Sequence, residues 1–380
     1  MNKKRILVVS SNAFSLVNFR GDFIKRLIFE GYDVYTATDS YTDEVINTLK
    51  AYGVKATLEY QLQRTGLNPL KDLKTISNLK LLIKENNIDL VFPYTVKPVV
   101  YSSIAANKCK VPVISLITGL GFAFTGLTLK SRILQHVTEF LYKRSIRKNK
   151  VVVFQNNDDR QLFFDRGILT KKNHTEVVSG SGVNLDQYKF KTYKNDDTII
   201  RFVIVTRLIR EKGVHLFLEA AKTLKEKYPN TEFNVIGSVQ DSPSAIKTEE
   251  LQSLHKKGIV VFHGTQSNIL EHLTNNDVFV LPSFYREGVP RSILEALSVG
   301  LPIITTDTPG CRETVIEGEN GFLIPTQELE PLINAMEFFI KNPEKLKDMG
   351  LKSRDYAKNR FDVNLINDDL LKAINSVLVK

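Results

Sequence analysis

Short runs of apolar, mostly β-branched residues alternate along the chain with longer segments whose apolar positions recur every three to four residues. The runs have strand length and the segments have helix length, so the pattern predicts βαβ units with parallel strands. In the first half we expect strands at 5–10, 32–38, 90–93, 111–117 and 151–155, and helices at 21–30, 43–52, 73–86 and 99–107.

The second half repeats the same rhythm. We expect strands at 200–205, 233–236, 260–263, 278–281 and 303–306, and helices at 214–227, 248–256, 269–274 and 291–299. The polar stretch 189–197 would link the two series. The pattern therefore predicts an α/β protein of two Rossmann-like domains facing a cleft, with ligands at the carboxyl ends of the strands. We expect the domains to be 1–190 and 196–360, followed by a helix within 361–380 that crosses back to the first domain.

Charge divides the chain in two. The 380 residues carry a formal net charge of +10. Residues 1–194 hold 30 Lys and Arg against 16 Asp and Glu, whereas residues 195–380 hold 22 against 26. A basic half beside a mildly acidic half indicates that only the first domain meets an anionic surface or polymer.

Two neighbouring segments bear on membranes. Residues 111–129 carry no charge, but their glycines, proline and hydroxyl residues favour a strand and a loop over a membrane-spanning helix. Residues 130–150 hold seven basic residues and one acid, with Ile133, Val137 and Phe140 on roughly one helical face. This pattern fits equally a helix packed on the core and a basic amphipathic helix on a membrane.

Arg207 and Lys212 lie in the predicted loop after strand 200–205. A planar guanidinium and a compact ammonium at the carboxyl end of a strand are suited to neutralise a departing pyrophosphate.

A second loop follows strand 278–281. Gly288 lets the backbone approach a ligand, and Pro290 stands near the first position of the next helix, whose amide groups favour an anion. Glu287 and Glu295 flank this turn, so one carboxylate can accept from sugar hydroxyls and the other from ribose hydroxyls.

These motifs resemble those of family-4 retaining glycosyltransferases of the GT-B fold. The resemblance rests on Arg207-x4-Lys212, Glu287-x7-Glu295 and residues 300–321, which include Pro309-Gly310, and it covers nearly the whole chain. It implies that Glu287 binds the transferred sugar, Glu295 binds the ribose, and Arg207 and Lys212 stabilise the departing nucleoside diphosphate. Further donor contacts are expected from Gly237, Gly288, Val289, Pro290, Arg291, Ser292 and His263.

The first half resembles the CapM-like and PglA-like bacterial enzymes that extend undecaprenyl-diphosphate-linked sugars. The resemblance lies in residues 93–98, 118–121, 154–156 and 180–184, although Thr118 stands where many members carry a His. We expect the acceptor side to be formed by Arg20, Lys97, Thr118, Gly119 and Asn156.

The resemblance implies retaining, metal-independent transfer of an N-acetylated hexosamine or its deoxy form. The donor would be a UDP-sugar and the acceptor an undecaprenyl-diphosphate-linked sugar, in capsule, O-antigen or glycan assembly. We expect a cytoplasmic protein, peripheral on the anionic inner face of the cell membrane, with no cofactor, metal or nucleic-acid partner.

Two other functions remain possible at this stage. A UDP-sugar epimerase of the same fold would need additional acid–base groups, and a nucleic-acid-binding protein would leave Arg207, Glu287 and Glu295 unexplained.

Overall fold

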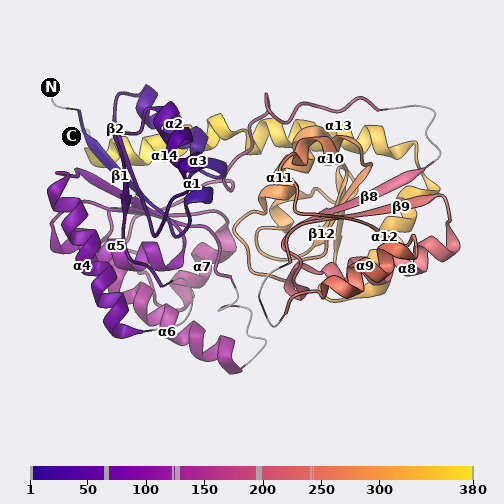
Figure 1. Ribbon diagram of the computed structural model, residues 1–380, viewed down its shortest axis with the longest axis horizontal. Coiled ribbons are helices and arrows are strands. Elements are labelled where there is room, and N and C mark those ends of the chain that lie inside the picture. Colours follow the sequence, from indigo (N-terminus) through magenta and orange to yellow (C-terminus); the bar gives the residue numbers. More distant parts are fainter. Residues whose placement is uncertain are drawn as a thin grey trace. The chain divides into compact units, whose positions relative to one another are not determined.

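The computed structural model describes residues 3–63, 68–121, 124, 129–193, 199–239, 242 and 244–378. The chain forms two compact units (Figure 1). Unit 1 comprises Met1–Ser181 and Val363–Lys380, and unit 2 comprises Gly182–Asp362.

Unit 1 is built on parallel strands in the order β3 (Ala56–Glu59), β2 (Asp33–Thr38), β1 (Arg5–Val9) and β4 (Leu90–Pro93). Parallel bridges from Val91 to Val113 and from Tyr94 to Leu116 continue this sheet into β5 (Ile114–Ile117), β6 (Val151–Phe154) and β7 (Thr175–Val177). Strands β1, β4, β5 and β6 consist almost entirely of buried apolar residues because helices cover both faces.

The helices of unit 1 follow the strands in the βαβ manner. They are α1 (Ala13–Asn18), α2 (Gly21–Phe29), α3 (Asp43–Tyr52), α4 (Pro69–Glu85), α5 (Val96–Lys108), α6 (Leu129–Ser145), α7 (Asn157–Asp165) and the C-terminal α14 (Val363–Leu378). Helix α14 packs beside α2, where Arg26 pairs with Asp368 at 2.9 Å, and it buries Ile366, Leu370 and Ile374. The last helix therefore belongs to the first unit.

Unit 2 contains a parallel sheet in the order β10 (Val261–Gly264), β9 (Thr231–Ile236), β8 (Ile200–Val205), β11 (Val278–Leu281), β12 (Ile303–Thr306) and β13 (Gly321–Ile324). Its α-helices are α8 (Val214–Lys227), α9 (Thr248–Lys256), α10 (Ile269–Thr274), α11 (Arg291–Val299), α12 (Leu329–Lys341) and α13 (Lys345–Tyr356). The strand order reverses between β8 and β11, and such a switch point is where open α/β sheets bind ligands.

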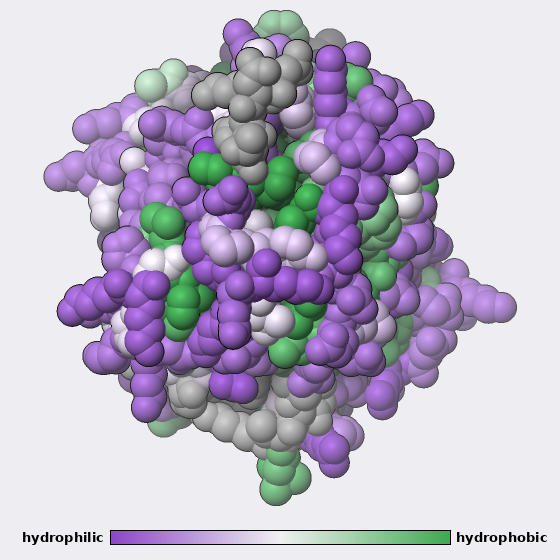
Figure 2. Space-filling view, turned by 90° about the vertical axis from the view of Figure 1, so that its right-hand side faces the viewer, coloured by the Kyte–Doolittle hydropathy of each residue, from purple (hydrophilic) through white to green (hydrophobic). Residues whose placement is uncertain are grey.

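One face of the molecule is mostly polar. Hydrophilic side chains dominate the face that Figure 2 shows, and apolar residues gather there in small patches. This is the surface composition of an ordinary globular domain.

The structure confirms the prediction of two Rossmann-like α/β domains. The boundary between the units lies at Ser181–Gly182, before the predicted end of the first domain at residue 190 and before the predicted linker 189–197. Residues 182–193 therefore belong to unit 2. The Val183 N–H donates to the Phe361 carbonyl at 2.8 Å, and the Tyr188 side chain joins the core of unit 2. The expected cleft between domains stays a prediction.

The uncharged stretch contains strand β5, as the sequence predicted, although the strand begins at Ile114. Most of the glycine-rich loop after it, including Gly126, lies outside the described residues. Within the described part of the chain, no helix combines the length and the apolar character needed to cross a membrane.

Candidate functional site

The loops that follow β8 and β11 are joined at the switch point of unit 2. The carbonyl oxygen of Glu211 accepts hydrogen bonds from the N–H groups of Phe284 (2.9 Å) and Tyr285 (3.0 Å). Gly213 makes this approach possible: its φ is +73°, and a Cβ at this position would lie 2.0 Å from the Pro282 carbonyl oxygen. The two predicted donor loops therefore form one rigid structure.

Lys212 and Glu287, one from each loop, form an ion pair in which both side chains are largely buried. Ser283 Oγ donates a further hydrogen bond to Glu287 Oε1 at 3.2 Å. A buried carboxylate and ammonium keep their charges only when they are paired or solvated by polar groups. Because an ammonium group carries three N–H donors, Lys212 can contact a negative ligand while it stays paired with Glu287.

Tyr285 connects the two predicted cations. The Arg207 guanidinium carbon lies 5.2 Å from the centre of the Tyr285 ring, and Lys212 Nζ lies 5.3 Å from it. Cations are attracted to the face of an aromatic ring at such distances. Arg207 is exposed whereas Lys212 is buried, so the guanidinium is the more accessible of the two.

Helix α11 begins beside these side chains. Pro290 is its N-cap rather than its first residue, and no hydrogen bond from a described side chain caps the helix there. The loop that contains Gly310 packs directly on Gly288: a Cβ on Gly310, whose φ is +82°, would lie 1.7 Å from the Gly288 carbonyl oxygen. Val289 is buried, and Ser292 is partly exposed in the first turn.

Glu295 lies one turn further along α11. Arg291 Nε lies 3.0 Å from Glu295 Oε1, and the Tyr188 hydroxyl also bonds this carboxylate. Burial raises the pKa of Glu295, while the charge and hydrogen bond of Arg291 act in the opposite direction. The Glu295 carboxylate, the second of the Glu287-x7-Glu295 motif, is therefore held by hydrogen bonds from Arg291 and Tyr188.

The two remaining donor candidates lie at the carboxyl ends of β9 and β10. The Gly237 N–H donates to the Gly264 carbonyl at 2.9 Å. His263 Nε2 lies 2.6 Å from Asn234 Oδ1, and its ring centre lies 4.7 Å from that of His272. Burial, and secondly the charge of His272, lower the pKa of His263.

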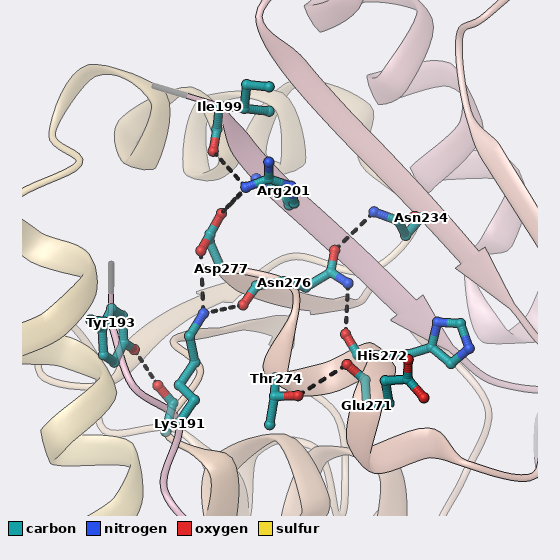
Figure 3. A network of polar contacts seen from close by, with 11 residues as sticks. Lys191, Tyr193, Ile199, Arg201, Asn234, Glu271, His272, Thr274, Asn276 and Asp277 are labelled. Atoms are coloured by element: carbon teal, nitrogen blue, oxygen red, sulfur yellow. Dashed lines mark hydrogen bonds and ion pairs between the residues drawn. The ribbon is translucent and has the colours of Figure 1, made fainter. Parts of the chain in front are cut away.

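Figure 3 shows the polar network to which Asn234 belongs. Asn234 Nδ2 donates to Asn276 Oδ1 at 2.9 Å, and Asn276 Nδ2 donates to the His272 carbonyl at 2.7 Å. At the amino end of β11, Lys191 Nζ pairs with Asp277 at 3.2 Å. This network holds residues 191–193 and strands β8, β9 and β11 in register, so it supports the site from the opposite end of the sheet.

The acceptor-side candidates all lie in unit 1, with varied surroundings. Lys97 Nζ donates to the Gln63 carbonyl at 2.6 Å, and burial lowers its pKa despite the nearby Asp72. Arg20 is buried with its guanidinium carbon 5.4 Å from the Tyr94 ring centre. The side chain of Asn156 caps α7 by accepting from the Asp159 N–H at 2.7 Å. Thr118 and Gly119 directly follow β5.

Sequence reasoning missed a group of hydroxyls at the carboxyl ends of β1 and β4. Ser15 Oγ lies 2.6 Å from Ser10 Oγ and 2.8 Å from the Tyr94 hydroxyl, and Ser11 Oγ lies 3.2 Å from Thr95 Oγ1. Thr95 adopts a φ of +67°, which strains a β-branched residue. The signal available in the sequence was the run of hydroxyl residues after strand 5–10.

Metal binding finds no support in the described residues, where no group of three or more His, Cys, Asp and Glu side chains could hold an ion.

Comparisons with known proteins match both halves of the chain. The family model described as "Glycosyl transferase 4-like" matches residues 5–156, and that described as "Glycosyl transferases group 1" matches residues 186–356.

Two of the curated relatives match this chain over nearly its whole length. The chain is 29% identical to N,N'-diacetylbacillosaminyl-diphospho-undecaprenol alpha-1,3-N-acetylgalactosaminyltransferase of Campylobacter jejuni, over 98% of this chain and 99% of that protein. It is 24% identical to the capsular polysaccharide biosynthesis glycosyltransferase CapM of Staphylococcus aureus, over 98% and 96% of the two chains. Neither the epimerase nor the nucleic-acid-binding alternative is favoured by these matches.

Solved structures share the fold. A glycosyltransferase from Rickettsia africae superimposes with a TM-score of 0.80 at 19% identity, with full coverage of both chains. HepE from Anabaena, in complex with UDP, gives a TM-score of 0.76 at 20% identity and covers 99% of this chain and 100% of that one. With its motifs, its fold and both family matches in agreement, the chain belongs to the family-4 retaining glycosyltransferases of the GT-B fold.

Proposed function

We propose that this enzyme transfers a sugar from a UDP-sugar to an undecaprenyl-diphosphate-linked sugar during assembly of a bacterial surface glycan. The transferred sugar would be an N-acetylated hexosamine or its deoxy form, and transfer would retain its anomeric configuration without a metal ion. The observation that carries this proposal is the Lys212–Glu287 pair beside Arg207 at the switch point of unit 2.

The donor side follows from the charges at this point. Arg207 and Lys212 both lie close to the Tyr285 ring, so a diphosphate bound beside that ring would meet both cations and the start of α11. Lys212 would contact the phosphate through its other N–H groups, and the remaining lone pairs of Glu287 would accept hydrogen bonds from the sugar. Preorganised donors of this kind stabilise the charge that develops on the β-phosphate, typically by about 3 kcal/mol each. Glu295 would accept from the ribose hydroxyls.

The expected acceptor residues are Lys97, Asn156, Arg20, Thr118 and Gly119, and the strained Thr95 supports the same end of the unit 1 sheet. Strained backbone gathers at sites where binding needs a fixed geometry. Lys97 would face the lipid diphosphate, since it is the acceptor-side candidate with an ammonium group. Asn156 would contribute by positioning α7, because its side chain caps that helix.

Contact with the membrane would occur through α6. One face of this helix is buried, with Ser131, Thr138 and Tyr142, whereas Leu129, Ile133 and Phe140 are 75%, 60% and 55% exposed. The Arg144 guanidinium carbon lies 5.2 Å from the Phe140 ring centre, and Lys143 is exposed beside it. Exposed apolar residues with adjacent cations are typical of helices that rest on an anionic lipid surface. On this proposal the helix would both pack on the core and rest on a membrane, the two interpretations that its sequence allowed.

The names of two relatives support the proposed substrates. The Campylobacter jejuni protein is named for a diphospho-undecaprenol acceptor, and an Escherichia coli galactosyltransferase, 28% identical over 78% of each chain, is named for a UDP-Gal donor.

A panel of nucleotide sugars incubated with a short-tailed lipid-diphosphate sugar tests the proposal. Mass spectrometry should detect an acceptor heavier by one sugar residue with a UDP donor. If product forms only with donors carrying another nucleotide, or only when the acceptor lacks a diphosphate, the proposal is wrong.

A further inference from the structure

A cavity of about 500 Å³ lies in unit 1 at the amino ends of β5 and β6. Most of the acceptor candidates follow the carboxyl ends of the strands, at the other end of the sheet. We refer to it as the amino-end pocket. Its lining includes Lys110, Lys148, Lys150 and His174, together with the amide of Asn107 and the hydroxyl of Ser376. Cavities of this size accommodate small-molecule ligands.

The cations of this pocket have few counter-charges. None of Lys110, Lys148 and Lys150 forms an ion pair within the described ranges of the chain. The carboxylate found at the pocket's edge is that of Glu176, 3.0 Å from His174 Nε2. Ammonium groups gathered around one cavity repel one another, and a bound anion would relieve this repulsion.

The backbone around the pocket is fixed. The Lys150 N–H donates to the Val113 carbonyl at 2.9 Å, and the Val152 N–H donates to the His174 carbonyl at 3.0 Å. Lys110 adopts a left-handed φ of +58°, a conformation that is uncommon for a residue other than glycine and costs conformational energy. Contacts between strands therefore hold the backbone of Lys150 and His174 in place.

A purely structural role accounts for only part of this arrangement. Lys110 follows the end of α5, where the helix carbonyls carry about half a negative charge and attract a cation. That partial charge does not balance three ammonium groups. The Ser376 hydroxyl donates to the Ala373 carbonyl at 2.7 Å, so the neutral donor added here is the Asn107 amide, whose two N–H groups include one directed at the Ser145 carbonyl at 3.4 Å. Ammonium groups beside an amide are groups that proteins use to bind phosphate oxygens.

We propose that the amino-end pocket binds a phosphate-bearing anion, either a soluble phosphorylated molecule or the phosphate of a lipid headgroup. The pocket lies entirely in unit 1, so this site is separate from the candidate donor site in unit 2.

Lysine labelling read by peptide mass spectrometry tests the proposal, because it reports each side chain separately. This resolution matters since pyrophosphate also suits the donor site. The full-length protein is acetylated with and without inorganic pyrophosphate, and with and without a water-soluble short-chain phosphatidic acid, at constant ionic strength. Lys50, Lys74 and Lys84 serve as internal controls, since they are exposed in unit 1 and lie outside the pocket.

We expect the three pocket lysines to be labelled at least fivefold more slowly with a ligand, while the control lysines change little. Protection by pyrophosphate identifies a soluble source, and protection by phosphatidic acid alone identifies a lipid headgroup. Calorimetry with the protecting ligand should show one binding event fewer for K110Q/K148Q/K150Q than for the wild type, whereas K50Q/K74Q/K84Q should keep every event. If neither ligand slows labelling of the pocket lysines more than that of the controls, the pocket does not bind phosphate.

Discussion

The ammonium group of Lys212 and the carboxylate of Glu287 form an ion pair between the loops that follow β8 and β11. The pair joins the two strands between which the strand order of unit 2 reverses. Because Gly213 allows the loops to approach and Ser283 holds Glu287, the pair is a fixed part of the site. This relationship leads to the first two predictions.

Replacing Glu287 by Gln should lower turnover by about 100-fold, because one preorganised contact to the transferred sugar is lost. The amide keeps the shape of the side chain but loses its charge, and UDP binding should persist. Steady-state kinetics and calorimetry with UDP measure the two effects. Glu249→Gln, an exposed carboxylate on α9, is the matched control and should leave turnover unchanged. Turnover of Glu287→Gln within threefold of wild type would exclude the assigned role.

Arg207 and Lys212 should act on the same leaving group, so their contributions should not be additive. Each substitution by Ala should reduce kcat/KM by about 100-fold, and the double variant should lose clearly less than the product of the two effects. A double-mutant cycle on kcat/KM measures this coupling. Strict additivity would mean that the cations, although both lie against Tyr285, serve different ligands.

Helix α6 should bind anionic vesicles through its exposed residues. We expect the variant I133S/F140S/K143Q/R144Q to sediment much less with anionic liposomes but to keep its activity on a short-tailed acceptor. Binding of the wild type should weaken with salt, since the screening length falls from about 10 Å at 0.1 M to about 3 Å at 1 M. Arg147 is excluded from the variant because its guanidinium bonds the Gly167 and Ile168 carbonyls.

The matched control for α6 is L73S/L81S/K74Q/K84Q, which makes the same types of substitution at exposed positions of α4. It should bind vesicles like the wild type. Equal loss in both variants, or equal binding of the wild type to neutral and anionic vesicles, would contradict a specific role for α6.

His263 should make unit 2 less stable as the pH falls. Its pKa is lowered in the folded protein, so below about 6.5 the unfolded chain takes up the proton more readily and folding loses free energy. The melting temperature should therefore decrease between pH 7.5 and 5.5. His263→Gln, which can still bond Asn234, should show a smaller decrease; an unchanged pH dependence would assign the effect to other groups.

Features that depend on local periodicity could be predicted from the sequence. The bounds of α11, residues 291–299, match the prediction because its buried side recurs at helical spacing and Gly300 ends it in a left-handed conformation. Helix α7 was missed because it is short and polar, although Asn156 followed by Asp158 and Asp159 is a recognisable helix start.

Contacts between distant segments were beyond the reach of the sequence. Nothing local to Tyr285 indicates that its ring faces both Arg207 and Lys212, because the packing of two loops brings them together. The hydrogen bond from Tyr188 to Glu295 likewise joins residues more than 100 positions apart. The positive φ of Thr95 depends on its place at the end of β4 rather than on its residue type.

The stereochemistry of the product tests the central claim most directly. A UDP-linked α-N-acetylhexosamine and a short-tailed lipid-diphosphate sugar are incubated with the enzyme, and the anomeric proton of the new linkage is observed by NMR. The account predicts a single α-linked product, formed by the wild type and nearly absent with Glu287→Gln. A β-linked product, or an α-linked product formed equally well by Glu287→Gln, would contradict it.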